Sequence, residues 1–589
     1  MRRISIVLGL VMATLYQYFF PFFDKWGEGY PSNVYIKLQT LALLKGDFRV
    51  GDTPFDLMPD WAWANGVQQV WGLGLPLLYS PFEWIWQLLC SEHFPDRAAF
   101  SLLFTVSVVL LSSALGKPIG HKVLGTVFII AALGSVLGHP IFGGLLATRF
   151  SHLEEHSLSG QLVVLVAISS AVFFIEKPTL LRKYFLIFLT SGLVWFRPTL
   201  AIYSGALIVG VTFVYYNEKS KREALSFLKL SAAALIASFI FLAATNKVRF
   251  GEYREFGHRL NSVGNSIKTF EWKFGSGIEN EEFTKKAYDI FYTMFFPQPL
   301  NGPIHHHSIF ESNGYLLRSR SFIHSHYSIW EFLLVSLGLF YTFIFLRRSG
   351  ELSTSLRALT FSAVLVLVTL FIFYSLTPHI ATRYYLDFFA AWITLKILLI
   401  YLFLRCLRHA GRPVVTMVIS ALFLTLFIAV AIYDWRHQSS LDSNMRRHLV
   451  TFDEGLRLSS FFKRQPKVLP NNYTCDGPSP DSFILYNGSG WNHGKDCYVG
   501  PSTTFYFKSF NCIEIKYRTV YKSFPRVKRN LKFLERIKTQ AHEAGYQVTE
   551  FCANEPSELA FDSLFVSWIN SEDLLKVVQP TVLKSIRVW

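Results

Sequence analysis

Runs of about 20 apolar residues recur along this chain, and they constrain its fold more than any other feature. A helix of that length crosses the hydrocarbon core of a bilayer, where only helices and closed barrels satisfy every backbone polar group. Of the 589 residues, 51% are hydrophobic and 17% are charged. Since about a quarter of a soluble protein is charged, we predict an all-α polytopic membrane domain rather than a soluble enzyme.

We expect eleven transmembrane helices in this domain. No small-residue cleavage site follows the first run, so we expect that helix to be retained rather than removed as a signal peptide. The expected spans are 4–22, 98–115, 122–138, 158–176, 183–196, 199–216, 224–245, 329–346, 357–376, 383–404 and 413–434.

One further apolar stretch, 70–90, is expected to lie along the membrane surface without crossing it. It contains two prolines, two glycines and Glu83, and it is rich in Trp, a composition that suits an interfacial helix. With this assignment, the short loops on one face hold sixteen Lys and Arg residues against four Glu. A crossing at 70–90 would divide those clusters between the two faces.

Basic residues collect in cytoplasmic loops, so the sequence predicts a cytoplasmic N-terminus and an extracytoplasmic C-terminus. The formal net charge of +16 would suggest nucleic-acid binding in a soluble chain. Here most of this charge lies in the predicted cytoplasmic loops and indicates how the chain is oriented in the membrane. We therefore expect no nucleic-acid partner. The transmembrane domain is expected to cover 1–434, with external segments at 23–97 and 246–328 and an extracytoplasmic domain at 435–589.

The predicted extracytoplasmic domain holds four of the six cysteines, an even number that suits an oxidising compartment. The sequence leaves all three pairings open. These cysteines are Cys475, Cys497, Cys512 and Cys552.

Within that domain, alternating apolar and polar residues bounded by turn residues predict strands. These stretches are 483–486, 504–507, 513–517 and about 546–551. Between the last two, Pro525 is expected to begin a basic helix, with Val527, Leu531 and Leu534 on one face, that Gly545 ends. We therefore predict a C-terminal α+β domain.

Acidic residues in the first external segment are candidates for catalysis. Asp24 and Glu28 stand directly after the first span, and Asp56 and Asp60 follow further along. Carboxylates beside a bilayer are costly unless they are solvated or used, so each is a candidate general base or cation ligand. For any one of them, a solvated loop is the alternative.

A second external cluster opens the span at 158. His152, Glu154 and Glu155 have a spacing that brings side chains together at a helix start. Acidic residues there also suit the helix dipole, which is the structural alternative. The sequence supplies no further ligands that would complete a strong metal site, and we assign none.

The third cluster is basic and external. Lys247 and Arg249 follow the span that ends near 245, Arg197 lies in a turn between two spans, and Arg383 begins another. The forked guanidinium group matches a lipid-linked phosphate or pyrophosphate better than an ammonium group does. Arginines that extend to the membrane interface are the alternative.

Several segments, taken in order and with the predicted topology, carry a resemblance to a known family. They are Phe23-Asp24-Lys-Trp-Gly-Glu28-Gly-Tyr, Leu-Ala-Leu-Leu-Lys-Gly-Asp-Phe (41–48), Phe55-Asp56-Leu, Asn65-Gly66, Trp71-Gly72-Leu-Gly-Leu-Pro76, His-Leu-Glu-Glu-His (152–156), Trp195-Phe-Arg197-Pro198-Thr, Asn246-Lys-Val-Arg249-Phe250-Gly251, Glu255-Phe256-Gly257 and Arg383-Tyr-Tyr-Leu-Asp387-Phe388. The pattern resembles the GT-C superfamily of integral-membrane glycosyltransferases, which includes protein O-mannosyltransferases and aminoarabinose transferases.

The resemblance implies transfer of a sugar from a polyprenyl-phosphate donor to a glycan, lipid or protein acceptor on the extracytoplasmic face of a bacterial plasma membrane. It implies that an acidic residue of the first loop is the base of an inverting displacement. Asp24 or Glu28 would be that base, and Asp56 and Asp60 stay open because the adjacent acidic pair of many members is absent.

The resemblance also assigns the other candidate residues. Arg249 and Arg383, joined by Arg197 and Lys247, would hold the donor phosphate. The remaining candidates, which would line the substrate cavity, are His152, Glu154, Glu155 and Trp71. No cofactor is required, and a divalent cation is used by some members of the superfamily but is not indicated here.

Three other functions stay open on the sequence. A transporter or lipid flippase is disfavoured by the sparse acidic residues inside the spans, where Asp387 is the main exception. An O-antigen polymerase or ligase has related chemistry, but its function is expected in the largest external loop. A non-enzymatic scaffold would use the membrane domain only to present its C-terminal domain.

Overall fold

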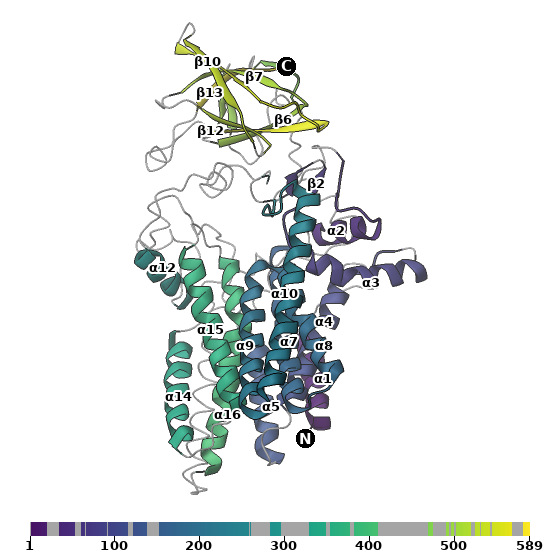
Figure 1. Ribbon diagram of the computed structural model, residues 1–589, viewed down its shortest axis with the longest axis vertical. Coiled ribbons are helices and arrows are strands. Elements are labelled where there is room, and N and C mark those ends of the chain that lie inside the picture. The colour runs from purple at the N-terminus through teal and green to yellow at the C-terminus, as the bar shows by residue number, and fades with distance from the viewer. Residues whose placement is uncertain are drawn as a thin grey trace.

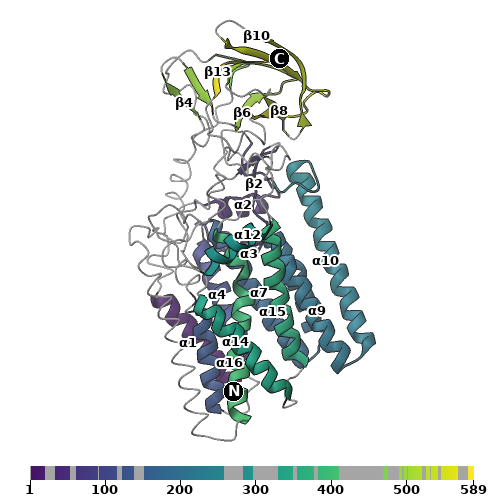
Figure 2. The same cartoon turned by 90° about the vertical axis from the view of Figure 1, so that its left-hand side faces the viewer.

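Helices of this chain form an elongated bundle, and strands form a β-domain beyond one end of it (Figure 1). The N-terminus lies at the end of the bundle away from the β-domain, which holds the C-terminus (Figure 2). The computed structural model describes residues 2–19, 34–52, 61–64, 66–90, 92–115, 122–137, 139, 152–257, 260, 283–295, 329–348, 354–376, 382–409, 469–474, 490–493, 496–499, 502–519, 525–530, 532–541, 545–567 and 581–589.

Long helices lie at ten of the eleven predicted spans, and the eleventh, 413–434, lies outside the described residues. These helices are α1 (Arg2–Phe19), α4 (Asp96–Leu115), α5 (Lys122–Leu137), α7 (His152–Glu176), α8 (Leu180–Phe196), α9 (Ala201–Glu218), α10 (Lys221–Phe250), α14 (Ile329–Arg348), α15 (Thr354–Leu376) and α16 (Phe389–His409). Shorter helical segments are α2 (Tyr35–Leu44), α3 (Gly74–Leu89), α12 (Phe283–Phe295), η3 (Pro198–Leu200) and η4 (Thr382–Phe388).

Within the described part of the chain, six helical segments are long and apolar enough to cross a membrane. They are Asp96–Ala114, Glu155–Glu176, Pro198–Glu218, Lys221–Phe250, Thr354–Leu376 and Tyr384–Leu404. The sequence prediction of a polytopic helical membrane protein is therefore supported, whereas the count of eleven spans stays a prediction.

Helices α2 and α3 lie crosswise at the end of the bundle that faces the β-domain (Figures 1 and 2). The turn that leads into α3 packs directly on the end of α8. A Cβ atom added to Gly74 would stand 2.7 Å from the backbone nitrogen of Phe196, and one added to Gly72 would overlap the Phe196 carbonyl oxygen. Only glycine permits this approach, so close packing accounts for the two glycines of the Trp-Gly-Leu-Gly segment.

The β-domain consists of two antiparallel sheets, and a separate hairpin, β1 (Trp61–Trp63) with β2 (Val67–Gln69), belongs to the first external segment. One sheet has the order β10-β11-β7-β13-β5-β4, with β3 also on β13, and the other has the order β6-β12-β8-β9. The strands are β3 (Asn472–Thr474), β4 (Gly490–His493), β5 (Asp496–Val499), β6 (Ser502–Lys508), β7 (Cys512–Arg518), β8 (Arg526–Arg529), β9 (Lys532–Phe533), β10 (Glu535–Ala541), β11 (Gln547–Cys552), β12 (Phe561–Ser567) and β13 (Thr581–Val588).

Both sheets bury alternate residues in one shared core. In β7, Ile513, Ile515 and Tyr517 point inward and are fully buried, and they join Phe507 of β6 and Leu564 of β12 in the same apolar cluster. The strands predicted at 504–507, 513–517 and 546–551 are confirmed, and the one at 483–486 lies outside the described residues.

The predicted helix after Pro525 is wrong, because β8, β9 and β10 occupy this segment and the domain is all-β in its described part. The apolar residues match a helical period by chance, and the turn between β8 and β9 falls at Asn530. Its φ of +52° places it in the left-handed region that Asn tolerates. Its side chain donates to Asp562 Oδ1 at 2.9 Å and accepts from the Ser563 backbone nitrogen at 2.9 Å, which ties the turn to β12.

One disulfide joins the neighbouring strands β7 and β11, between Cys512 and Cys552. These residues stand directly opposite each other in the strand register. Of the other two cysteines in this domain, Cys475 and the side chain of Cys497 lie outside the described residues. The predicted oxidising environment of the domain fits this bond.

We predict that a proteolytic digest of the unreduced protein contains a peptide pair joined through Cys512 and Cys552. Replacing both cysteines with Ser is expected to lower the free energy of unfolding of the β-domain by about 2–5 kcal/mol, because the bond restricts the unfolded chain. Cys90→Ser, at a free cysteine, is the control and is expected to leave the digest pattern unchanged. A digest that links Cys512 to another cysteine would contradict the assignment.

Candidate functional site

A buried arginine lies where the longest helix meets the first external segment. Arg249 stands in the last turn of α10 and is 4% exposed. Its Nη2 donates to the backbone oxygen of Gln69 in β2, and its guanidinium carbon lies 4.6 Å from the centre of the Phe250 ring. In the part of the chain that the structure describes, no carboxylate lies within ion-pair distance of Arg249, and its Nε has no acceptor.

Two residues close to Arg249 in the fold carry amide side chains with unused hydrogen-bonding atoms. Gln69, which accepts from Arg249 through its backbone, has a fully buried side chain whose Nε2 and Oε1 have no partner among the described residues. Asn246, one turn earlier on the same face of α10, also has both side-chain polar atoms buried and unpaired there. Most buried polar groups in proteins are hydrogen-bonded, and a buried charge is normally paired. An anion beside Arg249 would offset this buried charge.

Arg197, predicted to bind the donor phosphate, is instead paired inside the bundle. Its Nη1 lies 2.7 Å from Asp387 Oδ1 and also donates to Ser157 Oγ at 2.9 Å. The other oxygen of Asp387 accepts from Thr199 Oγ1 at 2.8 Å and from the Tyr374 hydroxyl. Because the charge of Arg197 is already balanced, its observed role is to join α7, α8, α15 and η4.

Of the other two predicted phosphate ligands, only Lys247 has a described side chain, and it contacts Gly251 and Tyr253. Lys247 is exposed, and its Nζ donates to the Gly251 carbonyl oxygen at 2.6 Å and lies 5.7 Å from the Tyr253 ring. Arg383 belongs to η4, and its side chain lies outside the described residues. Among the basic candidates with described side chains, Arg249 is thus the one whose charge is both buried and unpaired.

A second buried cluster ties the first external segment to the bundle. Lys37 of α2 lies 2.7 Å from Glu83 Oε2 of α3 and 2.8 Å from Asp96 Oδ1 at the start of α4. Glu83 also accepts from Gln87 Nε2 at 2.9 Å and contacts His93 Nδ1 at 2.6 Å. All three ion-paired side chains are at most 1% exposed, so these contacts hold α2 and α3 on the bundle.

The pKa values of this cluster reflect the pairing. Burial alone would lower the pKa of Lys37, but the attraction of Asp96 and Glu83 outweighs it and raises the pKa above the ordinary 10.5. Burial alone would raise the pKa of Glu83, but Lys37 lowers it below the ordinary 4.5. The Lys37 contribution to stability is lost only as pH rises past its raised pKa, and the Glu83 contribution only as pH falls past its lowered pKa.

Glu155 is the member of the second predicted cluster whose side chain is described. It is fully buried, and its Oε1 accepts from the Tyr79 hydroxyl of α3 at 2.8 Å. The side chains of His152 and Glu154 lie outside the described residues, whereas Trp71 is half-buried and packs on the bundle core. The predicted bases Asp24, Glu28, Asp56 and Asp60 also lie outside the described residues.

Sequence reasoning missed several residues of these clusters. Lys37 is a single charge in an apolar helix, and Asp96 stands where an acidic residue commonly begins a helix. Gln69 and Asn246 carry no charge, and although Asn246 begins the Asn246–Gly251 segment that carries the resemblance, no role was assigned to it from the sequence. Only the position of Lys37 within an otherwise apolar helix offered a signal, because such a charge requires a buried partner.

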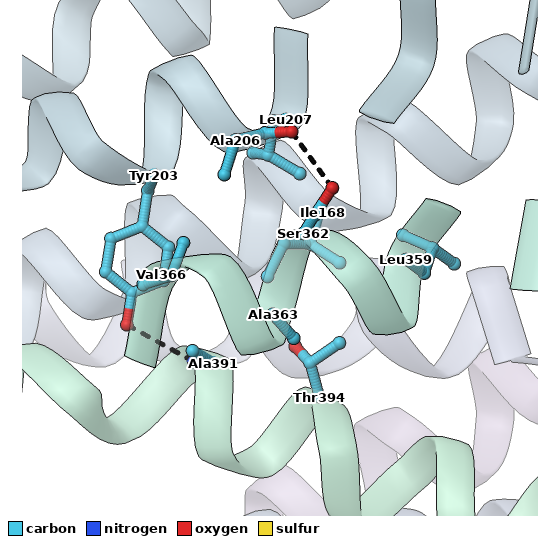
Figure 3. A pocket seen from close by; sticks show the side chains of 10 residues that line it. All are labelled: Ile168, Tyr203, Ala206, Leu207, Leu359, Ser362, Ala363, Val366, Ala391 and Thr394. Carbon is cyan, nitrogen blue, oxygen red and sulfur yellow. Dashed lines mark hydrogen bonds between the residues drawn. The ribbon is translucent and has the colours of Figure 1, made fainter. Parts of the chain in front are cut away.

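The bundle also contains a small apolar crevice of about 20 Å³ between α7, α9, α15 and α16 (Figure 3). Its polar groups are already bonded, since Ser362 Oγ donates to the Ala206 carbonyl oxygen at 2.9 Å and the Tyr203 hydroxyl accepts from the Ala391 nitrogen at 3.2 Å. A crevice of this volume holds about one water, so it does not accommodate a sugar or a lipid.

The fold and these clusters define a polytopic helical membrane protein with a β-domain at one end and a buried, unpaired arginine between them in the described structure. No protein-family model matches the chain, and a search of curated proteins returns no significant match. Among the described residues, no group of three or more His, Cys, Asp or Glu side chains is placed to hold a metal ion.

We predict that Lys37→Met lowers the free energy of unfolding at pH 7 by about 3–5 kcal/mol, because it leaves two buried carboxylates without their cation. The measurement is the thermal unfolding midpoint of the purified protein in detergent. Adding Glu83→Gln to Lys37→Met is expected to recover part of the loss.

The control for this prediction is Lys45→Met, at an exposed lysine just after the same helix. Its effect is expected to be within about 0.5 kcal/mol. Equal midpoints for Lys37→Met and Lys45→Met would show that the buried ion pairs do not stabilise the fold.

Proposed function

We propose that this protein is an integral-membrane glycosyltransferase of the GT-C type with eleven spans. In this proposal it transfers a sugar from a polyprenyl-phosphate donor to an acceptor on the extracytoplasmic face. The observation that carries the proposal is Arg249, a buried guanidinium without a carboxylate partner in the described structure. A lipid-linked phosphate is an anion that suits this position, because its lipid keeps it at the membrane surface.

The reaction explains why an unpaired cation would be useful there. A carboxylate takes the proton of the acceptor hydroxyl, the acceptor oxygen bonds to the anomeric carbon, and the bond from that carbon to the phosphate oxygen breaks. The polyprenyl phosphate leaves with the electron pair, and its charge rises from one to two negative charges. Arg249 would stabilise the transition state more than the bound donor, because the negative charge grows during the reaction.

The neighbouring amides would complete the phosphate site. Gln69 and Asn246 each have a side-chain NH₂ group with two donors, and among the described residues these groups are buried and unpaired. The base in this proposal is one of Asp24, Glu28, Asp56 and Asp60, all in the first external segment that also carries Gln69. No step needs a metal ion or a cofactor, because one base and one phosphate clamp suffice for an inverting displacement.

The arrangement of the first external segment supports the same proposal. Helix α3 runs crosswise at the end of the bundle, and its leading turn packs on α8 through Gly72 and Gly74. A crosswise helix at that position suits an interfacial element that covers a lipid-facing site. The end of α10 carries Arg249 to β2 of the same external segment, on the side of the bundle that faces the β-domain.

We predict that Arg249→Gln lowers sugar transfer by about 100-fold, because it removes charge stabilisation from the transition state. Arg249→Lys keeps the charge but loses the fork and is expected to retain more activity. The assay is transfer from radiolabelled polyprenyl-phosphate sugars, both hexoses and pentoses, in membranes that contain each variant. Thermal stability is not expected to fall in Arg249→Gln, because the variant removes an unpaired buried charge.

Arg254→Gln, at an exposed arginine five residues further on, is the matched control and is expected to keep wild-type transfer. Undiminished transfer by Arg249→Gln would contradict the site assignment. Binding of a polyprenyl phosphate without transfer of any sugar would instead favour a flippase, and extension of a lipid-linked glycan would favour a polymerase or ligase.

A further inference from the structure

The β-domain contacts the first external segment through a small apolar interface. This interface contains Tyr35, Trp61, Trp63 and Val67 from the first segment with Tyr506 from β6, and Phe561 of β12 packs at its edge. The indole nitrogen of Trp63 donates to the Phe561 carbonyl oxygen at 3.0 Å, and the two rings meet edge to face at 6.0 Å. Trp63 is 3% exposed, so its side of this contact is buried, whereas Phe561 is half-buried.

The hairpin that carries Trp63 also carries Gln69. In the β1–β2 register, Trp63 pairs with Val67 and Trp61 pairs with Gln69. The hairpin is extended by residues 50 and 51, since the Val50 nitrogen donates to the Val67 oxygen at 2.8 Å. One end of this short sheet is therefore held by the β-domain, and the other end supplies the carbonyl oxygen that Arg249 binds.

A hairpin of this size needs support from outside. Two-stranded ribbons are only marginally stable in water, and β1 and β2 have three residues each. In the described structure, Trp61 packs on Tyr35 of α2 with ring centres 5.0 Å apart, and Trp63 packs on the β-domain. The Trp63 contact thus fixes the hairpin from the side opposite the bundle.

We propose that the β-domain is a positioning part of the Arg249 site, and that Trp63 is the residue through which it acts. Trp63 holds the hairpin so that the Gln69 carbonyl oxygen accepts a hydrogen bond from Arg249. Without the contact to the β-domain, the hairpin moves more freely and the site binds its anion less tightly. Trp63 is a positioning residue, because it touches Phe561 and not the anion. This inference rests on the proposed function, since it concerns the same phosphate site and adds the β-domain to the parts of the protein that shape it.

The test uses the full-length protein in detergent, with farnesyl phosphate as the probe and farnesol as the uncharged comparison. Trp63→Phe removes the indole donor and keeps an aromatic ring, and Phe561→Leu removes the matching ring from the β-domain side. Each is expected to weaken farnesyl phosphate binding by about three- to tenfold, in the lower part of the range of coupling between neighbouring groups. Trp84→Phe is the matched control, at a Trp of α3 that is 57% exposed, and is expected to leave the affinity unchanged.

A double-mutant cycle separates positioning from general loss of structure. In an Arg249→Lys background, Trp63→Phe is expected to change the affinity by less than about twofold, because the contact that it positions is already lost. Hydrogen exchange of residues 66–70 provides a second measurement and is expected to speed up in Trp63→Phe but not in Trp84→Phe.

The outcomes distinguish the two proposals. Wild-type affinity in Trp63→Phe and Phe561→Leu would overturn the positioning role and leave the Arg249 site intact. An equal loss of affinity in both Arg249 backgrounds would also overturn it, because Trp63 would then act independently of Arg249. No preference of the wild-type protein for farnesyl phosphate over farnesol would overturn the phosphate site itself and the positioning role with it.

Discussion

The cost of burying a charge explains how the buried cations of this protein are placed. Moving an ion from water into a protein interior costs several kcal/mol unless a partner offsets it. Arg197 meets Asp387 in the bundle, and Lys37 meets Glu83 and Asp96 at its end. Arg249 is equally buried but has no such partner in the described structure. The same physical rule therefore separates two paired structural clusters from one buried arginine that has no carboxylate partner among the described residues.

The paired clusters join elements that are distant in sequence. Asp387, just before α16, binds Arg197 at the turn between α8 and α9, which lies 190 residues earlier in the chain. Lys37 connects two crosswise helices to α4, so the first external segment is fastened to the bundle by charge as well as by apolar contact. Removing one partner from such a cluster lowers stability because it leaves the other charge buried and unpaired.

Sequence patterns predicted the bundle well because a repeated apolar run of membrane length is rare outside a bilayer-spanning helix. The crosswise course of α3 could also be predicted from the sequence, since Pro81 and the glycines at the start of this segment disfavour a lipid-exposed span. Which of the basic candidates is buried without a carboxylate partner could be predicted only in part. Arg197 and Arg249 have the same side chain and similar positions after a span, and they differ only in whether a carboxylate from a distant helix reaches them.

The wrong helix prediction after Pro525 has a related cause. Three apolar residues at helical spacing are weak evidence, because the same residues can alternate or lie at a turn. The decisive interaction was non-local, because the Asn530 side chain bonds to Asp562 and Ser563 of β12, more than 30 residues further along the chain. Such contacts follow from strand pairing, which a single segment of sequence does not specify.

The length of α10 explains why the unpaired arginine lies at the edge of the bundle. This helix has 30 residues, whereas about 20 suffice to cross the hydrocarbon core. The apolar stretch ends near residue 245, so Asn246 and Arg249 fall in the final turns beyond it. Figure 1 shows these turns rising toward β2, where Gln69 meets Arg249. At that position Arg249 contacts the hairpin and is 4% exposed, and a charge shielded from water in this way attracts an anion more strongly than one in bulk water.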